Sequence, residues 1–185
     1  MPKQLKNISI KKLFNLPFHE FENYHNQLRY LLPKDSINKI QGKQLTSLTF
    51  GDVITIRKGI NSPDIDKLTN MFRLVFGMKP RKVMSLKTVQ FYQAFNWIKE
   101  QIELITKREN KKLSSEPEPK LKMAGIDELN RFGELNTLKA LAVLFSTKPQ
   151  EIAKWNYSFV FSLVWQEKIS NDINKKYMKL LTPKK

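Results

Sequence analysis

The chain has 185 residues, of which 41% are hydrophobic and 11% aromatic. This apolar content is too high for a disordered chain, so we expect a packed fold of one domain or of two small ones. The sequence contains no cysteine, which excludes a disulfide framework, thiol catalysis and cysteine-based zinc sites.

The net charge of +16 is the most unusual global property of the sequence. Residues 1–112 carry a net charge of +12, and residues 113–185 carry +4. A field of this size attracts nucleic acid, anionic membranes or acidic proteins. However, Lys outnumbers Arg by 27 to 6, and sequence-reading DNA interfaces favour the bidentate fork of Arg. We therefore favour a solvated basic surface over specific recognition of a nucleic-acid sequence.

The N-terminal part of the chain carries neither a signal peptide nor a membrane span by its pattern. It has no long apolar run and no small-residue cleavage site. The longest apolar run of the chain, Ala140 to Phe145, is far shorter than a span requires. No membrane partner is expected. The first clear element is an amphipathic helix that begins after Pro17 and ends before Pro33.

Residues 48–57 are ambiguous between a strand and a helix. The β-branched run of residues 53–56 favours a strand. Thr49 followed by Asp52 instead resembles a capping box, and the apolar side chains also fall on helical spacing. We favour a short helix and leave the strand as the alternative.

The next helix has the clearest boundary signals in the sequence. Ser62 is a natural N-cap, Pro63 suits the first helical position, and Gly77 is a natural C-cap. A long helix is then predicted from Ser85 to about Lys112.

Residues 114–122 form a predicted linker, because the Glu-Pro-Glu-Pro run favours an extended spacer. This divides the chain into an N-terminal helical region, residues 1–113, and a C-terminal helical region, residues 123–185. The second region ends in a long helix, from about Ser158 to Leu181. The predicted fold class is mainly α, with two helical halves joined by a short Pro-containing linker and little or no sheet.

The sequence shows no catalytic signature. His19 and His25 lie six residues apart on one helix, which places them on different faces and does not suit a shared metal. Carboxylate pairs such as Asp64 and Asp66 stand at helix starts, where the helix dipole explains them. We therefore expect a protein that is not an enzyme, with no metal, no cofactor and no small-molecule substrate.

Two sets of side chains are candidates for contacts with partners. The first set would contact nucleic acid or an acidic partner through positive charge: Lys79, Arg81, Lys82, Lys107, Arg108, Lys111 and Lys112. The second set would lie at an interface because aromatic side chains are large and apolar: Phe91, Tyr92, Trp97, Trp155 and Trp165.

Two segments resemble proteins of tailed double-stranded-DNA bacteriophages. In residues 124–181, GIDELNRFGELNTLKALA is followed by KPQEIAKWNYSFVFSLVWQEKISNDINKKYMKL. An acidic-started helix ending at Phe132-Gly133 precedes a compact Leu-rich helix, a short helix leading to Trp155, and an aromatic helix with a basic end. In residues 46–105, LTFGDVITI followed by DIDKLTNMFRLVFG is similar to tail-assembly chaperone-like and tail or connector ring proteins.

The resemblance implies a structural protein of a phage particle, present as a multi-copy ring of the tail or head–tail connector. Its expected partners are further copies of itself and other phage structural proteins, with DNA close by. Its expected location is the virion, after assembly in the host cytoplasm. Wide apolar helix faces are compatible with a symmetric oligomer that buries them. A tail-assembly chaperone and a non-sequence-specific nucleic-acid-binding module are the alternatives.

Overall fold

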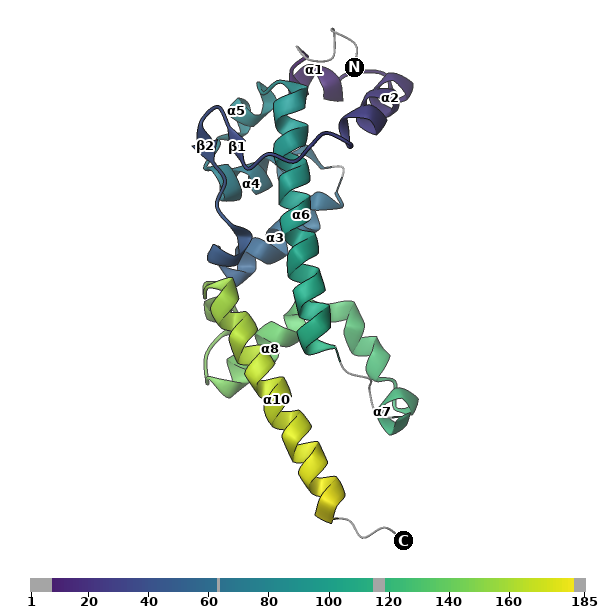
Figure 1. Ribbon diagram of the computed structural model, residues 1–185, viewed down its shortest axis with the longest axis vertical. Helices are drawn as coiled ribbons and strands as arrows, with labels where there is room; N and C mark the ends of the chain where they lie inside the picture. The colour runs from purple at the N-terminus through teal and green to yellow at the C-terminus, as the bar shows by residue number, and fades with distance from the viewer. Residues whose placement is uncertain (1–7, 63, 115–118, 182–185) are drawn as a thin grey trace. The chain divides into compact units, whose positions relative to one another are not determined.

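The computed structural model of the chain describes residues 8–62, 64–114 and 119–181. These residues form α-helices and short 3-10 helices, with one small two-stranded sheet among them (Figure 1). The predicted mainly α fold class is confirmed.

The chain divides into two compact units, which we describe separately. Of the described residues, the first unit comprises 8–48 and 52–105, and the second comprises 49–51 and 106–181. The predicted linker at 114–122 therefore falls within the second unit. Its residues 115–118 lie outside the described residues, and the helix α7 (Pro119–Met123) occupies much of the rest.

The first unit is built from short helices around the start of one long helix. Its elements are α1 (Ile10–Phe14), α2 (Phe18–Leu28), β1 (Ser36–Ile37), β2 (Ile40–Gln41), η2 (Leu45–Ser47), α3 (Phe50–Ile60) from Asp52 onward, α4 (Ile65–Phe76), α5 (Pro80–Met84) and the N-terminal turns of α6 (Thr88–Leu113). The two strands pair antiparallel, with Ser36 opposite Gln41. Asn38 and Lys39 form the tight turn between them, and both have positive φ, as a two-residue hairpin turn requires.

The ambiguous segment at 48–57 is helical from Phe50 onward, as part of α3. The strand alternative is therefore excluded for those residues, although they include four β-branched side chains in a row. The apolar spacing decides the structure here because Val53 and Ile56 fall on the same face of the helix, where both are buried.

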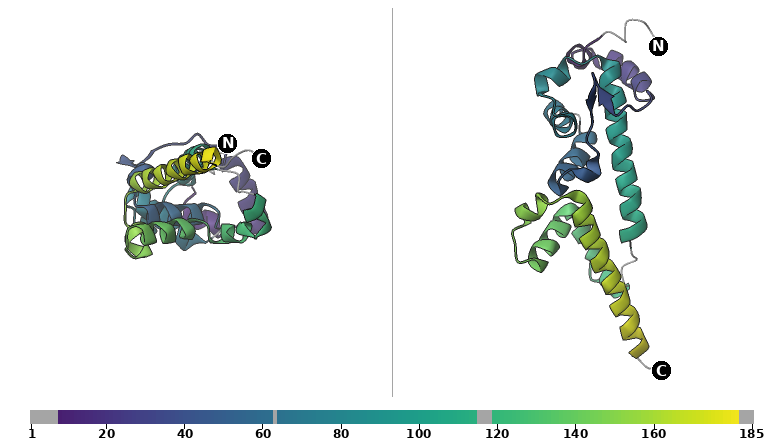
Figure 2. Two further views of the ribbon diagram at one scale, coloured as in Figure 1. Left: turned by 90° about the horizontal axis from the view of Figure 1, so that it is seen from below. Right: turned by 60° about the vertical axis from the view of Figure 1, so that its left-hand side comes forward.

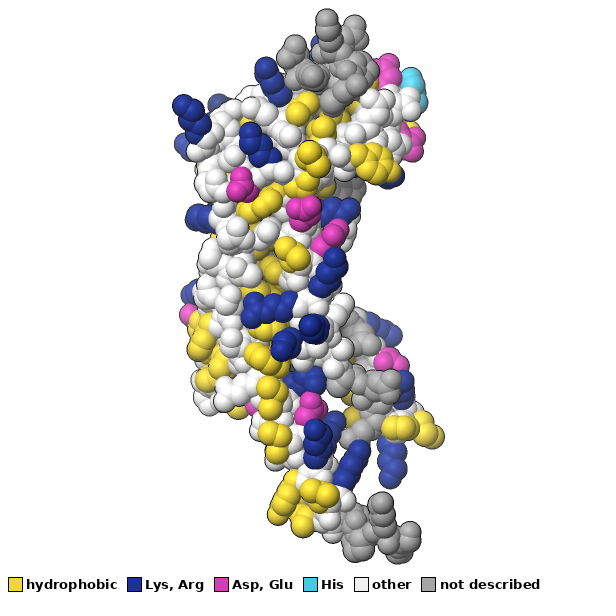
Figure 3. All heavy atoms as spheres, in the orientation of Figure 1, with side chains coloured by type: hydrophobic (Ala, Val, Ile, Leu, Met, Phe, Trp, Pro, Cys, Tyr) yellow, Lys and Arg dark blue, Asp and Glu magenta, His cyan; other side chains and the backbone are white. Residues whose placement is uncertain are grey.

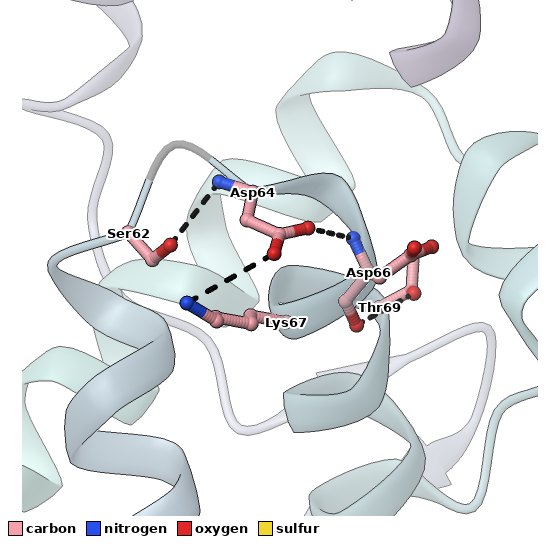
Figure 4. A network of polar contacts seen from close by, with 5 residues as sticks. All are labelled: Ser62, Asp64, Asp66, Lys67 and Thr69. Atoms are coloured by element: carbon pink, nitrogen blue, oxygen red, sulfur yellow. Dashed lines mark hydrogen bonds and ion pairs between the residues drawn. The ribbon is translucent and has the colours of Figure 1, made fainter.

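The start of α4 is shifted from its predicted position (Figure 4). The N-cap is Asp64, whose carboxylate accepts a hydrogen bond from the backbone N–H of Asp66 at 2.9 Å. The predicted cap, Ser62, instead accepts a hydrogen bond from the N–H of Asp64 at 3.3 Å. The helix ends at Gly77, which has the left-handed φ of 66° that its predicted C-cap role requires.

The core of the first unit lies between α3, α4 and α6. Phe72 of α4 is fully buried and stacks on Phe91 of α6, with ring centroids 4.6 Å apart. Gly42 lies so close to this core that a Cβ atom there would stand 2.7 Å from the ring of Trp97. The core is therefore tightly packed at this point, where only a glycine fits.

The second unit has a smaller core. Its elements are the C-terminal turns of α6, α7, η3 (Ile126–Phe132), α8 (Glu134–Leu144), α9 (Pro149–Ala153) and α10 (Tyr157–Leu181). Phe50 belongs to this unit: its N–H donates to the carbonyl of Trp155 at 2.8 Å, and its ring stacks on Tyr157. The buried side chains gather near the N-terminal end of α10, where Tyr157, Val160 and Phe161 lie.

Candidate functional site

Three of the seven predicted basic contact residues lie together in the first unit. Lys79 is the N-cap of α5, and Arg81 and Lys82 lie within that helix. All three are exposed. Val83 of the same helix is fully buried, so it anchors one face and turns the basic side chains to the other.

A second segment brings further positive charge to the same place. The N–H of Ile10 in α1 donates to the carbonyl of Leu86, and the N–H of Thr88 donates to the carbonyl of Ile8, both at 2.9 Å. These bonds join α1 to the turn between α5 and α6. The α1 residues Lys11 and Lys12, and Lys87 in the turn, are exposed there.

We call this set the α1–α5 basic patch: Lys11, Lys12, Lys79, Arg81, Lys82 and Lys87. Lys and Arg side chains gather at the upper left of Figure 3, where Figure 1 labels α5. Sequence reasoning missed the three lysines outside α5 because their proximity depends on pairing between distant segments. One local signal was available: residues 78–99 contain no Asp or Glu.

The other four predicted basic residues lie in the second unit, on the last turns of α6. Two of them have a local role there. The guanidinium of Arg108 lies 4.2 Å from the ring centre of Phe161, and the ammonium of Lys112 lies 4.3 Å from that of Trp165. These cation–π contacts attach α6 to α10. Lys107 and Lys111 are exposed. The seven predicted residues are thus divided between the two units.

The predicted interface aromatics also separate into two groups. Phe91, Tyr92 and Trp97 are 3%, 3% and 8% exposed and fill the core of the first unit. Their expected place at an interface is therefore corrected: a broad aromatic face on α6 is covered by neighbouring helices of the same unit. Trp155 and Trp165 are half-buried in the second unit and keep part of their surface exposed.

Trp155 belongs to an exposed aromatic cluster of the second unit. Its ring centre lies 5.3 Å from that of Phe145 at the end of α8, and 5.7 Å from that of Phe159 in α10. Phe145 is 43% exposed and Phe159 is 53% exposed. We call Phe145, Trp155 and Phe159 the aromatic cluster. Sequence reasoning identified only Trp155, because the exposure of Phe145 and Phe159 depends on which elements meet and the local sequence does not show this.

A second apolar surface runs along the C-terminal half of α10. Ile169, Ile173, Tyr177 and Leu180 recur at spacings of four, four and three, which places them on one face of the helix. All four are exposed, and we call them the α10 stripe. This half of α10 extends away from α8 and α9 (Figure 2), and hydrophobic side chains follow it in Figure 3.

Basic residues flank the α10 stripe on one side. Lys168 donates to the carboxylate of Asp172 at 2.6 Å. This hydrogen bond, together with the positive charges of Lys168, Lys175 and Lys176, lowers the pKa of Asp172 from its ordinary value. The carboxylate is thus ionised at neutral pH, and the flank keeps an excess of positive charge.

The first unit also contains an apolar pocket of about 510 Å³ beside α2. Aromatic side chains dominate its lining: Phe14, Phe18, Phe21, Phe91 and Phe95. The predicted amphipathic stripe of α2 borders this space. Among the residues of α2, only Leu28 is buried.

His25 and Tyr92 are the titratable groups among the described residues that line this pocket. The hydroxyl of Tyr92 lies 2.9 Å from Nδ1 of His25. Burial lowers the pKa of His25, and the positive charges of Arg29 and Lys99 lower it further. Burial raises the pKa of Tyr92 to about 12. Both groups are therefore neutral at pH 7, when the phenol can donate to the imidazole.

The described residues contain no cluster of three or more His, Cys, Asp or Glu side chains that is suited to a metal ion. Within the same residues, no helix is both long enough and apolar enough to cross a membrane. Exposed surfaces of the described residues include the α1–α5 basic patch, the aromatic cluster and the α10 stripe.

Comparisons of the chain with family models, with curated proteins and with solved structures found no match.

Proposed function

We propose that this chain is a non-enzymatic structural protein of a phage particle, which acts as a multi-copy ring component of the tail or head–tail connector. The observation that supports an oligomer is the exposure of the α10 stripe, whose four apolar side chains are 43–84% exposed. The phage assignment rests on the resemblance of residues 46–105 and 124–181 to tail and connector proteins.

The second unit offers two different apolar surfaces, as a ring contact needs. Phe159 of the aromatic cluster precedes Ile169 of the α10 stripe by ten residues, which is about 15 Å along the helix. A ring forms when one surface of each subunit meets a different surface of the next and the rotation closes. In the proposed ring, the α10 stripe of one copy packs on the aromatic cluster of its neighbour.

The energetics favour a closed assembly over an isolated pair. Burying one large aliphatic side chain contributes about 1.5–3 kcal/mol, so the partly exposed stripe contributes roughly 4–8 kcal/mol. Association costs about 4–15 kcal/mol in lost freedom of motion. One such contact is therefore weak by itself. In a closed ring every subunit has two contacts, and the last subunit forms both at once.

Electron microscopy of the purified chain in negative stain tests the ring directly. We expect closed particles of uniform diameter. A field of single small particles at concentrations well above those used for imaging other rings would contradict the proposal.

Mass spectrometry of purified phage particles tests the place of the chain in the virion. Stoichiometric presence in particles of the phage that encodes it supports a structural component. An oligomer that forms in solution and is absent from finished particles would instead favour the tail-assembly chaperone.

A further inference from the structure

We propose that the α1–α5 basic patch binds the phosphodiester backbone of a nucleic-acid duplex without reading its sequence. This interaction is separate from the oligomer contacts, because the patch belongs to the first unit and both apolar surfaces belong to the second.

The patch concentrates positive charge with little local neutralisation. Six cationic side chains come from two segments that the backbone bonds of Ile10 and Thr88 hold together. Residues 8–16 and 78–99, which contain all six, include no Asp or Glu. None of the six forms an ion pair with a carboxylate in the described part of the chain.

The local fold holds the backbone of these six residues in a fixed arrangement. Ile10 and Leu13 of α1 are fully buried, and so is Val83 of α5. In helices of five residues, such anchors fix which side chains face the solvent. The contact between α1 and α5 then keeps the two basic segments adjacent. The patch is therefore formed before any partner binds, which lowers the entropic cost of binding.

The composition of the patch favours phosphate contact over base recognition. Five of its six residues are Lys, which meets phosphate as a point charge, and only Arg81 offers a bidentate fork. The aromatic ring of α1, Phe14, stacks on Phe21 with ring centres 5.6 Å apart, so it is engaged within the unit rather than free to stack on an unpaired base. A duplex, with one charge per about 1.7 Å of its axis, matches a dense cluster of this kind.

Fluorescence anisotropy with short labelled duplexes tests the proposal. The full chain is titrated with DNA and RNA duplexes, each in two unrelated sequences, between about 50 and 200 mM salt. Six phosphate contacts predict a loss of affinity of about 10³-fold over that range and a log–log slope near −5. Equal affinity for the two sequences is expected. Tighter binding of either the DNA or the RNA duplexes identifies which nucleic acid the patch binds.

Three variants distinguish duplex binding by the patch from binding by the overall positive charge of the chain. The first is Lys79→Gln/Arg81→Gln/Lys82→Gln, and the second is Lys11→Gln/Lys12→Gln/Lys87→Gln. Each is expected to reduce the slope by about 2.7, because each phosphate contact contributes about 0.9. The matched control is Lys175→Gln/Lys176→Gln/Lys179→Gln on α10, which is expected to keep the slope of the unchanged chain. Circular dichroism confirms that each variant is folded.

Several outcomes would overturn the proposal. One is the absence of duplex binding at about 50 mM salt, where phosphate contacts are strong. Another is an equal loss of slope in the α10 control, which would assign binding to net charge alone. Binding to polyglutamate or to phosphatidylserine vesicles in preference to both duplexes would assign the patch to another class of partner. Because the patch lies in the first unit and the proposed ring contacts lie in the second, failure of ring formation leaves this test intact.

Discussion

The two units of the chain differ in what becomes of their apolar helix faces. In the first unit, Phe72, Met71 and Ile98 are fully buried under neighbouring helices. In the second unit, Ile173 and Leu180 of α10 are 59% and 84% exposed. Both units contain amphipathic helices of similar periodicity, so the pattern alone does not distinguish them. Around α4 and the start of α6, the first unit buries these apolar faces within its own core, whereas in the second unit the C-terminal half of α10 keeps its apolar face exposed.

The largest expected effect of a single substitution is in the core of the first unit. Phe72→Ala removes a fully buried ring that stacks on Phe91 and Phe76. We expect the free energy of unfolding to fall by about 3–5 kcal/mol, because a cavity replaces the ring. Urea denaturation followed by circular dichroism measures this change.

Leu180→Ala is the matched control in the second unit. Its side chain is 84% exposed, so at protein concentrations low enough for monomers the change should be within about 0.5 kcal/mol. A loss as large as that of Phe72→Ala would contradict the view that the two units differ in this way.

A smaller effect on stability is expected at a polar contact between α6 and α10 in the second unit. The hydroxyl of Tyr157, which is 1% exposed, donates to the carboxylate of Glu109 at 2.8 Å. Tyr157→Phe should reduce stability by about 1–2 kcal/mol, since the hydrogen bond is lost and the ring stays in place. Hydrogen exchange of the first turns of α10 detects the loss locally. Tyr177→Phe, on an exposed ring of the same helix, should leave that exchange unchanged.

The smallest expected effect is a dependence of the first unit's stability on pH. Burial lowers the pKa of His25 in the folded chain. The unfolded chain therefore binds a proton more readily, and stability should decrease as the pH falls below about 6.5, the ordinary pKa of histidine. Thermal unfolding between pH 7.5 and about pH 5 measures the slope.

Two substitutions on α2 show which group causes this dependence of stability on pH. His25→Gln should flatten it, whereas His19→Gln should leave it as in the unchanged chain. A slope that persists in His25→Gln would show that another group causes it.

Much of the fold can be predicted from local signals in the sequence. The C-cap at Gly77, the long helices α6 and α10 and the mainly α class follow from caps and apolar spacing. The N-cap of α4 was placed two residues early, because Ser62 and Asp64 are both good caps and only the backbone geometry selects Asp64. Local propensity also left the start of α3 undecided.

The candidate surfaces were harder to predict, because they depend on which elements meet. Periodicity shows that a helix has an apolar face but not what covers it. Phe91 and Trp97 are covered by neighbouring elements, whereas Phe145 and Phe159 are exposed, and the apolar pattern does not distinguish the two cases. Lys11 and Lys87 come together only through the backbone pairing of α1 with the turn before α6. This pairing joins segments more than seventy residues apart, and no local pattern indicates it.

The most direct test of the contrast between the units is the molar mass of the chain in solution. Light scattering coupled to size exclusion is measured for the unchanged chain, for Ile173→Asp in the α10 stripe and for Met178→Asp, which lies about 140° around the helix from Ile173. The two positions are matched in exposure, at 59% and 61%. We predict a multiple of 21.8 kDa for the unchanged chain and for Met178→Asp, and a shift toward 21.8 kDa for Ile173→Asp. A mass of 21.8 kDa for the unchanged chain at every concentration would contradict the account.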